Sequence, residues 1–209
     1  GALPFFLGAT EARFVDAFFE AMSGLTTTGS TVFSGLDELP KGLLLWRGIL
    51  QWLGGIGIVV VAMVFLPELR VGGMQIFRTE SFDTFGKILP RATEIASRIS
   101  VIYVSLTMAC AVAYVLAGMD AFDATVHAMT TIATGGFSNY NDSIGYFNSF
   151  PIEISAMIFI ILGSLPFIVY IKFLNGNLKI FTSDSQIKSF IRIIIFTILI
   201  LLIYLLIIN

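Results

Sequence analysis

The chain has 209 residues, of which 56% are hydrophobic and 12% are charged, and its mean hydropathy is +0.91. These values lie outside the range of soluble globular domains and predict an integral membrane protein. A formal net charge of −2 provides no excess of cations for a phosphate backbone, which excludes nucleic-acid binding.

The sequence predicts helical segments of two lengths. A helix needs roughly 20 mostly apolar residues to cross a hydrocarbon core of about 30 Å. Two helical patterns, over residues 10–25 and 120–132, are too short for this. Four windows are long enough, and we expect membrane spans over residues 43–66, 99–118, 151–174 and 189–208.

The connections between the spans differ in charge. Residues 67–98 and 172–192 contain most of the lysines and arginines, whereas Lys41 is the only cation in the connections 26–42 and 119–150. The positive-inside rule therefore predicts that the two basic connections are cytoplasmic and that the other two lie outside. This assignment alternates correctly across the four spans.

Each short helix ends in a run rich in threonine and glycine, and a full span follows after a polar stretch. A helix that stops halfway, followed by a loop that returns to the same face, is a re-entrant pore loop. Irregular backbone is tolerated at membrane depth only where it is buried in protein or lines a water-filled path. We therefore expect both loops to be functional.

The chain contains an internal repeat. Residues 16–22 recur at 123–129, with Asp-Ala and Ala-Met pairs in matching places at a constant offset of 107 residues. The same offset places Gly29 on Gly136, and the following spans match after a few inserted residues. A duplication explains this pattern, and matched units around an axis are a way to build a pore.

The threonine and glycine runs suit a filter for alkali cations. Such a filter needs several oxygens and no full charge that would trap the ion, and glycine permits the backbone angles that turn successive carbonyls toward an axis. The preceding helices would aim their partially negative C-terminal ends at the cation. An isolated run of this kind is more often an ordinary turn, but its recurrence favours a filter. The candidate ion-binding residues, which would bind potassium through backbone carbonyls, are Thr26, Thr27, Thr28, Gly29, Ser30, Ala133, Thr134, Gly135, Gly136 and Phe137.

Other residues in the apolar segments are interpreted as structural. The glycines at 54, 55 and 57 are expected to be close helix-packing positions. Arg47 is expected to snorkel to the outer interface, with pairing to a filter-supporting carboxylate as the alternative. Cys110 lies in an apolar run and is expected to be a packed thiol.

Polar residues of the short helices are harder to interpret. Glu20 and His127 occupy equivalent places in the repeat, where each could brace the filter or face the outer vestibule. Asp16 and Asp123 are expected near the helix starts, where a carboxylate is favourable for the helix dipole. Attraction of cations would be a secondary role for these two residues.

Several motifs resemble bacterial TrkH-type potassium uptake proteins of the Trk/Ktr/HKT superfamily in the same order. They cover most of the chain. Many members have more glycine and asparagine at residues 162–167, where Pro166 should kink or loosen the helix. The matching segments are residues 18–31, the Trp-Arg pair at 46–47 with the run 51–57, residues 71–75 and residues 131–138.

The resemblance implies an all-α integral membrane protein with units of helix, pore helix, filter loop and helix around a central ion pathway. Four units are expected in the complete subunit, of which this chain supplies about two. The chain begins at Gly1 without a signal-peptide pattern and ends inside an apolar run, so we expect it to be a segment of a longer protein. The expected divisions are a first pore-loop unit at 1–70, a cytoplasmic basic loop at 71–98, a second unit at 99–175, a cytoplasmic loop at 176–188 and the first helix of a third unit at 189–209.

The resemblance also implies potassium transport across the cytoplasmic (inner) membrane, with the protein embedded in membrane lipid and no cofactor. It implies a homodimer of the complete subunit and a cytoplasmic nucleotide-binding regulatory subunit, which could contact the basic connections. Glycine at residue 29 favours potassium, because serine in the first loop accompanies sodium permeation in some relatives.

Three alternatives compete with this hypothesis. A membrane enzyme would need carboxylates, histidines or metal ligands gathered at one depth, and the predicted spans contain no acidic pair. A structural or assembly subunit would have degenerate loops. A sodium-permeable relative would keep the architecture and differ in selectivity.

Overall fold

A computed structural model describes the backbone of residues 1–8, 10–65 and 88–208, and the side chains of residues 1–8, 10–57 and 96–207. All regular structure in these ranges is helical, which confirms the expected all-α class. The chain forms two compact units, Gly1–Ser164 and Leu165–Asn209, and each is described by itself.

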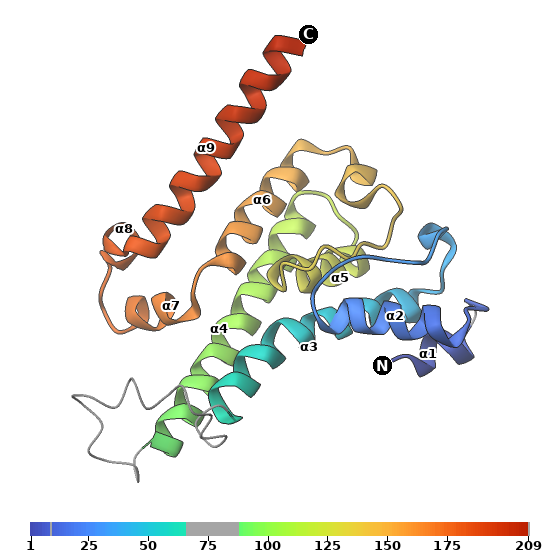
Figure 1. Ribbon diagram of the computed structural model, residues 1–209, viewed down its shortest axis with the longest axis horizontal. Helices are drawn as coiled ribbons and strands as arrows, with labels where there is room; N and C mark the ends of the chain where they lie inside the picture. The colour runs from blue at the N-terminus through green and yellow to red at the C-terminus, as the bar shows by residue number, and fades with distance from the viewer. Residues whose placement is uncertain (9, 66–87, 209) are drawn as a thin grey trace. The chain divides into compact units, whose positions relative to one another are not determined.

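The first unit contains the two short helices and three long ones (Figure 1). The long helix α3 packs against both short helices, α2 and α5, and against α4, while α6 packs against α4 and α5. This arrangement brings the ends of α2 and α5 to the same long helix. The bounds are α1 Leu3–Leu7, α2 Phe14–Leu25, η1 Leu36–Glu38, α3 Lys41–Phe65, α4 Ile88–Leu116, α5 Ala121–Ile132, η4 Ser143–Phe147 and α6 Phe150–Ser164.

Both short helices have 12 residues and therefore a length of about 18 Å, too short to cross a bilayer. The start of α5 agrees with its prediction, because the Asp120 side chain caps it by accepting from the Phe122 N–H at 3.0 Å. The predicted start of α2 at residue 10 was wrong, since α2 begins at Phe14. Thr10 instead donates to the carbonyl of Phe5 at 2.5 Å and so closes α1.

The expected spans correspond to helices of the structure. The expected span at 43–66 is α3, whose described backbone ends at Phe65. In the described ranges, Ala96–Leu116 of α4 and Ser185–Ile207 of α9 are long and apolar enough to cross a membrane, and the helices on either side of Pro166 could together form one more broken span. Helix α4 already begins at Ile88, inside the segment expected to be a basic loop.

The helical structure is interrupted between α6 and α7 at Pro166. Helix α6 ends at Ser164, and α7 begins at Phe167 with Pro166 as its N-cap. Proline has no N–H to donate and its ring clashes with the preceding turn of a helix, so it stops α6 and can stand before the first turn of α7. This confirms the predicted loosening of the helix there.

Polar contacts join α4 to α5 and to α3. The Tyr114 hydroxyl of α4 bonds Thr131 of α5 at 2.8 Å, and the Tyr103 hydroxyl of α4 donates to the carbonyl of Trp52 in α3 at 2.9 Å. Cys110 lies between these tyrosines on α4 and is fully buried, which confirms the expected packed thiol.

Two glycines of α3 lie in close contact with neighbouring segments. A methyl group at Gly54 would overlap the carbonyl of Leu25, and one at Gly55 would lie 3.0 Å from the Ala133 side chain. Both positions confirm the prediction of close helix contact. At Gly57 no described atom lies within 4 Å of such a methyl group, so close packing there stays a prediction.

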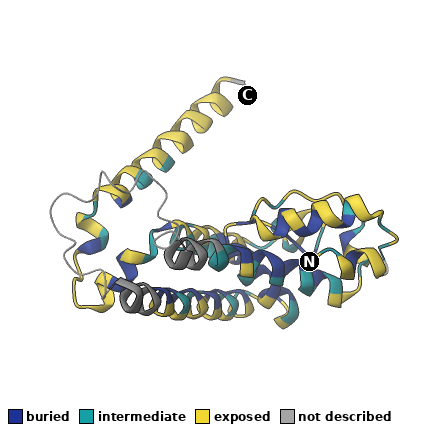
Figure 2. Cartoon of the chain, turned by 60° about the horizontal axis from the view of Figure 1, so that its bottom comes forward, coloured by how far each residue is buried: buried dark blue, intermediate teal, exposed yellow. Residues whose placement is uncertain are grey.

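The second unit consists of α7 Phe167–Leu174, α8 Ile180–Ser183 and α9 Ser185–Ile208. Figure 2 shows α9 exposed along most of its length, although its apolar window has a mean hydropathy of 3.0. So much exposed apolar surface requires lipid or further helices around α9. The basic side chains of this unit, Lys172, Lys179, Lys188 and Arg192, are all exposed.

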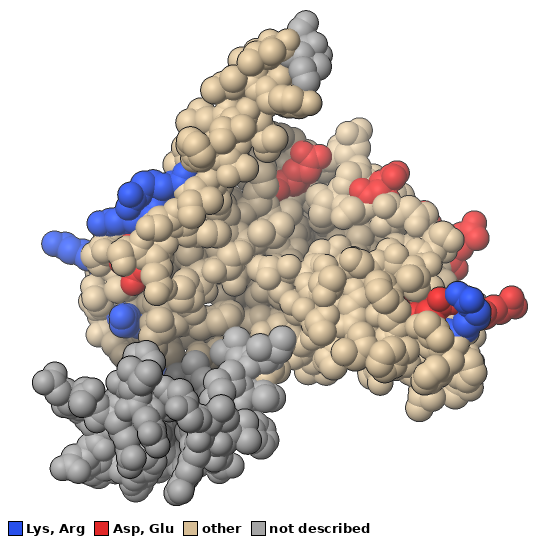
Figure 3. All heavy atoms as spheres, in the orientation of Figure 1, with Lys and Arg blue, Asp and Glu red and all other residues tan. Residues whose placement is uncertain are grey.

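Acidic side chains follow one edge of the first unit in Figure 3, and most of the remaining described surface in that view is uncharged. Asp37, Glu38, Asp120 and Asp142 are all exposed and belong to the connections expected outside the membrane. This distribution is consistent with the predicted sidedness, which stays a prediction.

Candidate functional site: two matched loops

The two loops leave their short helices in the same way. Three consecutive backbone N–H groups close the end of each helix, and every bond has a counterpart 107 residues later. Thr26 donates to Met22 at 2.8 Å as Ala133 does to Met129 at 3.1 Å. The other two pairs are Thr27 to Gly24 with Thr134 to Thr131, and Thr28 to Ser23 with Gly135 to Thr130.

The repeat extends to unusual backbone angles. Thr27 and Gly29 have φ of 54° and 77°, and Thr134 and Gly136 have φ of 52° and 78°. The left-handed region is unfavourable for a β-branched residue, so the surrounding structure must hold both threonines in it. In each loop one residue without positive φ stands between the two left-handed ones. Alternation of this kind turns neighbouring peptide groups toward a common side, as a filter lined by carbonyls requires.

The two loops touch each other directly. A methyl group at Gly29 would overlap the carbonyl oxygen of Gly135, so the first loop approaches the second more closely than any side chain would allow. A methyl group at Gly135 would overlap the amide of Gln51 on α3. The structure therefore brings the two predicted groups of site residues together beside α3.

Gln51 supports the second loop. Its Oε1 accepts from the Phe137 N–H at 3.0 Å, and the side chain is completely buried. Its Nε2 has no hydrogen-bond partner among the described residues. In the sequence Gln51 stands only in the run 51–57 that carries the family resemblance, and this role was not predicted.

Glu20 supports the first loop from within α2. This carboxylate is fully buried and accepts from the Thr31 hydroxyl at 2.9 and 3.0 Å and from the Val32 N–H at 3.1 Å. Ser23, one turn along the same helix, donates to the carbonyl of Ser30 at 2.5 Å. Of the two roles left open for Glu20, the structure selects the brace.

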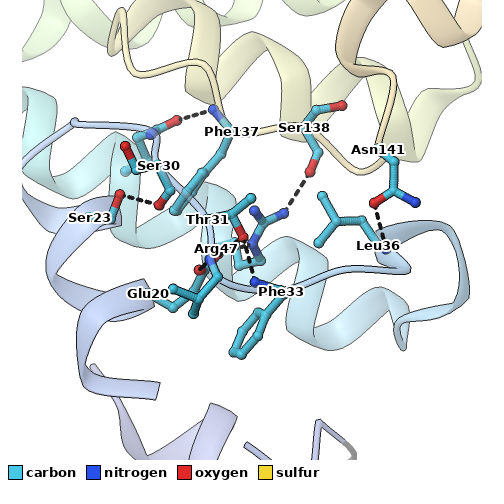
Figure 4. Close-up of polar contacts among 12 residues, drawn as sticks. Glu20, Ser23, Ser30, Thr31, Phe33, Leu36, Arg47, Phe137, Ser138 and Asn141 are labelled. Atoms are coloured by element: carbon cyan, nitrogen blue, oxygen red, sulfur yellow. Dashed lines mark hydrogen bonds and ion pairs between the residues drawn. The ribbon is translucent and has the colours of Figure 1, made fainter. Parts of the chain in front are cut away.

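Arg47 does not snorkel to the interface, so that prediction was wrong. The residue is 1% exposed, and its Nε donates to the Glu20 carboxylate at 2.8 Å (Figure 4). One terminal nitrogen donates to the carbonyl of Ser138 at 2.6 Å, and the guanidinium lies 4.2 Å from the centre of the Phe137 ring. A buried cation needs such partners, because burial without them would be too costly.

His127 is the counterpart of Glu20 and also braces its own loop. Its Nε2 lies 3.0 Å from the Ser138 hydroxyl and its Nδ1 lies 2.8 Å from the carbonyl of Asp123. Ser138 is the repeat counterpart of Thr31, so the same position of the short helix bonds the same loop position in both repeats. The first brace carries a charge and the second is an imidazole paired with a hydroxyl.

The two first-turn aspartates are at the predicted places but differ in their partners. Asp16 is paired with exposed Arg13 at 2.8 Å. Asp123 accepts from Asn139 at 2.8 Å and from the Tyr140 hydroxyl at 2.7 Å. Burial is the main cause that raises the pKa of Tyr140 above its usual range, and the hydrogen bond to Asp123 is the second cause. This phenol therefore remains a neutral donor.

The segments beyond the loops are joined as well. Asn141 accepts from the Leu36 N–H at 3.3 Å, which Figure 4 shows, and its amide donates to Asp37 at 2.8 Å. These bonds connect the outer parts of the two repeats.

A cavity of about 240 Å³ lies on the side of the second loop that faces α5, η4 and α6. Thr134, Gly135 and Gly136 contribute to its wall, together with Ala156 and Ile160 of α6. None of its described lining residues comes from α2, α3 or the first loop. The second loop thus has the first loop and Gln51 on one side and open space on the other.

Two half-length helices, two matched loops and apolar long helices define a membrane protein built from pore-loop units. Comparison with known proteins agrees with this class. The chain belongs to the TrkH family, described as "Cation transport protein", whose family model matches residues 2–209. That family is one of transport proteins and not of enzymes, and the protein is a membrane protein with several spans.

Individual relatives are similar over nearly all of the chain. The Trk system potassium uptake protein TrkI of Halomonas elongata is 44% identical over 97% of this chain and 42% of that protein. TrkH of Escherichia coli strain K12 is 46% identical over 92% of this chain and 41% of that protein. The crystal structure of the potassium transporter TrkH from Vibrio parahaemolyticus matches with a TM-score of 0.81 and 43% identity, over 96% of this chain and 41% of that one. The chain thus spans about two fifths of the length of these relatives.

Proposed function

We propose that this chain contributes two quarters of a carbonyl-lined selectivity filter to the membrane-spanning subunit of a Trk-type potassium uptake system. The observation that carries the proposal is the repeated pair of left-handed residues, Thr27 with Gly29 and Thr134 with Gly136. A simple turn between helices does not require two such residues, separated by one, at the same places in both repeats. The relatives' names, potassium uptake proteins and a potassium transporter, support the choice of ion.

The proposed mechanism needs only oxygens and oriented dipoles. Backbone carbonyls replace part of the hydration shell of the ion, and the absence of charged residues from both loops allows the ion to leave. Helices α2 and α5 end where the loops begin, so their partially negative ends favour a cation there. The residues proposed to contribute oxygens are Thr26, Thr27, Thr28, Gly29, Ser30, Ala133, Thr134, Gly135, Gly136 and Phe137.

The proposal includes the setting of the complete subunit. It lies in the inner membrane with the filter loops outside and the basic connections inside, and it needs no cofactor. It forms a homodimer and binds a cytoplasmic nucleotide-binding regulatory subunit. The exposed basic side chains of the second unit offer contacts for an acidic partner face.

Rubidium uptake into liposomes that contain the complete subunit tests the filter. Gly29→Ser and Gly136→Ser are compared with the wild type, with potassium or sodium as competitor. Serine at 136 must adopt a φ that strains it, and serine at 29 must in addition displace Gly135. We expect each replacement to reduce the preference for potassium about tenfold, equivalent to about 1.4 kcal/mol.

Gly35→Ser is the matched control, because Gly35 also has positive φ, at 70°, but lies outside both loops with no described atom near its added methyl group. Gly35→Ser should leave the preference for potassium over sodium unchanged. If folded Gly29→Ser and Gly136→Ser proteins discriminate as well as the wild type, the loops are structural and the alternative of a degenerate assembly subunit is correct. A wild type that prefers sodium would instead identify a sodium-permeable relative.

A further inference from the structure

The repeat can be followed into the long helices through their glycines. A methyl group at Gly54 of α3 would overlap the carbonyl of Leu25, the last residue of α2. A methyl group at Gly163 of α6 would lie 2.9 Å from the carbonyl of Ile132, the last residue of α5. Since Leu25 and Ile132 are themselves repeat counterparts, Gly54 and Gly163 occupy equivalent places, and α3 and α6 correspond at an offset of 109 residues.

At this offset the polar residues of α3 have apolar counterparts. Arg47 corresponds to Ala156 and Gln51 corresponds to Ile160. Arg47 and Gln51 are buried against the second loop, whereas Ala156 and Ile160 line the cavity on the other side of that loop. The polar pair is therefore not a general feature of the repeat, and its role concerns the junction between the two loops of this chain.

Arg47 and Gln51 stand one turn apart on the same face of α3 and hold consecutive residues of the second loop. Gln51 accepts from the N–H of Phe137, and Arg47 donates to the carbonyl of Ser138. The guanidinium also lies against the Phe137 ring. Together these contacts fix both the position and the orientation of the chain just after Gly136.

The other side of the same guanidinium holds the first loop. Its Nε donates to Glu20, which in turn accepts from the hydroxyl of Thr31 and the N–H of Val32. Arg47 is thus the one described residue bonded to both the brace of the first loop and the backbone of the second. A planar guanidinium has donors in fixed directions, which a lysine ammonium cannot reproduce.

We propose that Arg47 is a positioning residue that sets the second filter loop against the first, with Gln51 fixing the same loop one turn away. This inference rests on the proposed function, because it concerns the discrimination between ions. Loss of Arg47 lets the second loop shift toward the cavity of about 240 Å³ that borders it, so the oxygens of the two loops no longer match. The consequence is reduced selectivity rather than loss of transport.

The test uses the complete subunit in liposomes and rubidium uptake with potassium or sodium as competitor. The main variant is the double replacement Glu20→Gln with Arg47→Met, because removing both charges avoids a buried unpaired ion and favours folding. We expect this variant to keep the elution profile and melting temperature of a folded protein and to lose about tenfold in preference for potassium. A pair that contributes only to stability would leave the preference of the folded double variant unchanged, which would overturn the proposal.

Three further variants provide a test that does not depend on the folding of the double variant. Arg47→Lys keeps the charge without the two-sided donor geometry and should show an intermediate loss. Gln51→Leu acts on the same loop through Phe137 and should also reduce the preference, so an unchanged preference in folded Gln51→Leu counts against the proposal even if the double variant does not fold. Arg13→Gln removes the exposed pair with Asp16 and is the control that should behave as the wild type.

The result for Gly29→Ser separates this inference from the proposed function. If Gly29→Ser reduces the preference while the Arg47 and Gln51 variants do not, the loops form a filter and the positioning role is wrong. If Gly29→Ser has no effect, the proposed function itself fails.

Discussion

Replacement of Gly54 by alanine tests how closely α3 approaches the end of α2. The added methyl group would overlap the backbone of Leu25, which cannot rotate away as a side chain could. Overpacking of this kind costs about 1–3 kcal/mol, whereas alanine in place of a helical glycine gains about 1 kcal/mol. Gly57→Ala has the same propensity gain without an overlap with any described atom. The two variants should therefore differ in stability by about 1–3 kcal/mol.

The assay is thermal unfolding of the purified complete subunit in detergent, with both variants measured side by side. Gly54→Ala should melt at a lower temperature than Gly57→Ala, and Gly163→Ala should fall between them because its nearest atom is 2.9 Å away. Since Leu25 directly precedes Thr26, Gly54→Ala should also reduce discrimination between potassium and sodium. Equal melting temperatures and equal discrimination for Gly54→Ala and Gly57→Ala would refute this reasoning.

Three other outcomes are expected. Tyr140→Phe removes the donor to Asp123 and should lower stability by about 1–2 kcal/mol in the same unfolding assay while rubidium uptake continues. Cys110 is fully buried, so a membrane-permeant maleimide should label it only after denaturation, and rapid labelling of the native protein would contradict the packing described here. For the sidedness, Asp142→Cys should react with an impermeant maleimide added outside intact cells and Lys179→Cys only after the membrane is opened; the reverse pattern would invert the predicted topology.

The helices could be predicted from the sequence because the signals for them are local. The second short helix was expected over 120–132 and runs from Ala121 to Ile132, and the break at Pro166 follows from the chemistry of one residue. The first short helix was predicted four residues too early. Thr10 can start a helix as readily as it can close the preceding one, and the contact with Phe5 that decides between them is not visible in the local pattern.

The position of Arg47 could not be predicted in the same way. A cation near the end of an apolar span can reach the interface or pair with a buried partner, and the sequence around it is compatible with both. The choice depends on Glu20 and Ser138, which are 27 and 91 residues away in the chain. Only the packing of α2 and the second loop against α3 brings these partners together.

Some of the missed roles had a usable signal. Arg47 and Gln51 are polar residues four apart in an otherwise apolar span, which places them on one helix face. The repeat offset also places Thr31 on Ser138, so a hydroxyl stands at the same distance after each short-helix position of Glu20 and His127. These coincidences would have favoured the bracing role over the vestibule role.

The buried pair also has a consequence for the order in which the protein is made. Glu20 precedes Arg47 in the chain, so its carboxylate has left the ribosome before α3 enters the bilayer. A cation within a membrane helix is costly to insert, and a carboxylate partner lowers that cost. The second acceptor, the Ser138 carbonyl, is synthesised 91 residues later. The carboxylate partner of Arg47 is thus already synthesised when α3 is made, whereas the carbonyl partner is made only with the second loop.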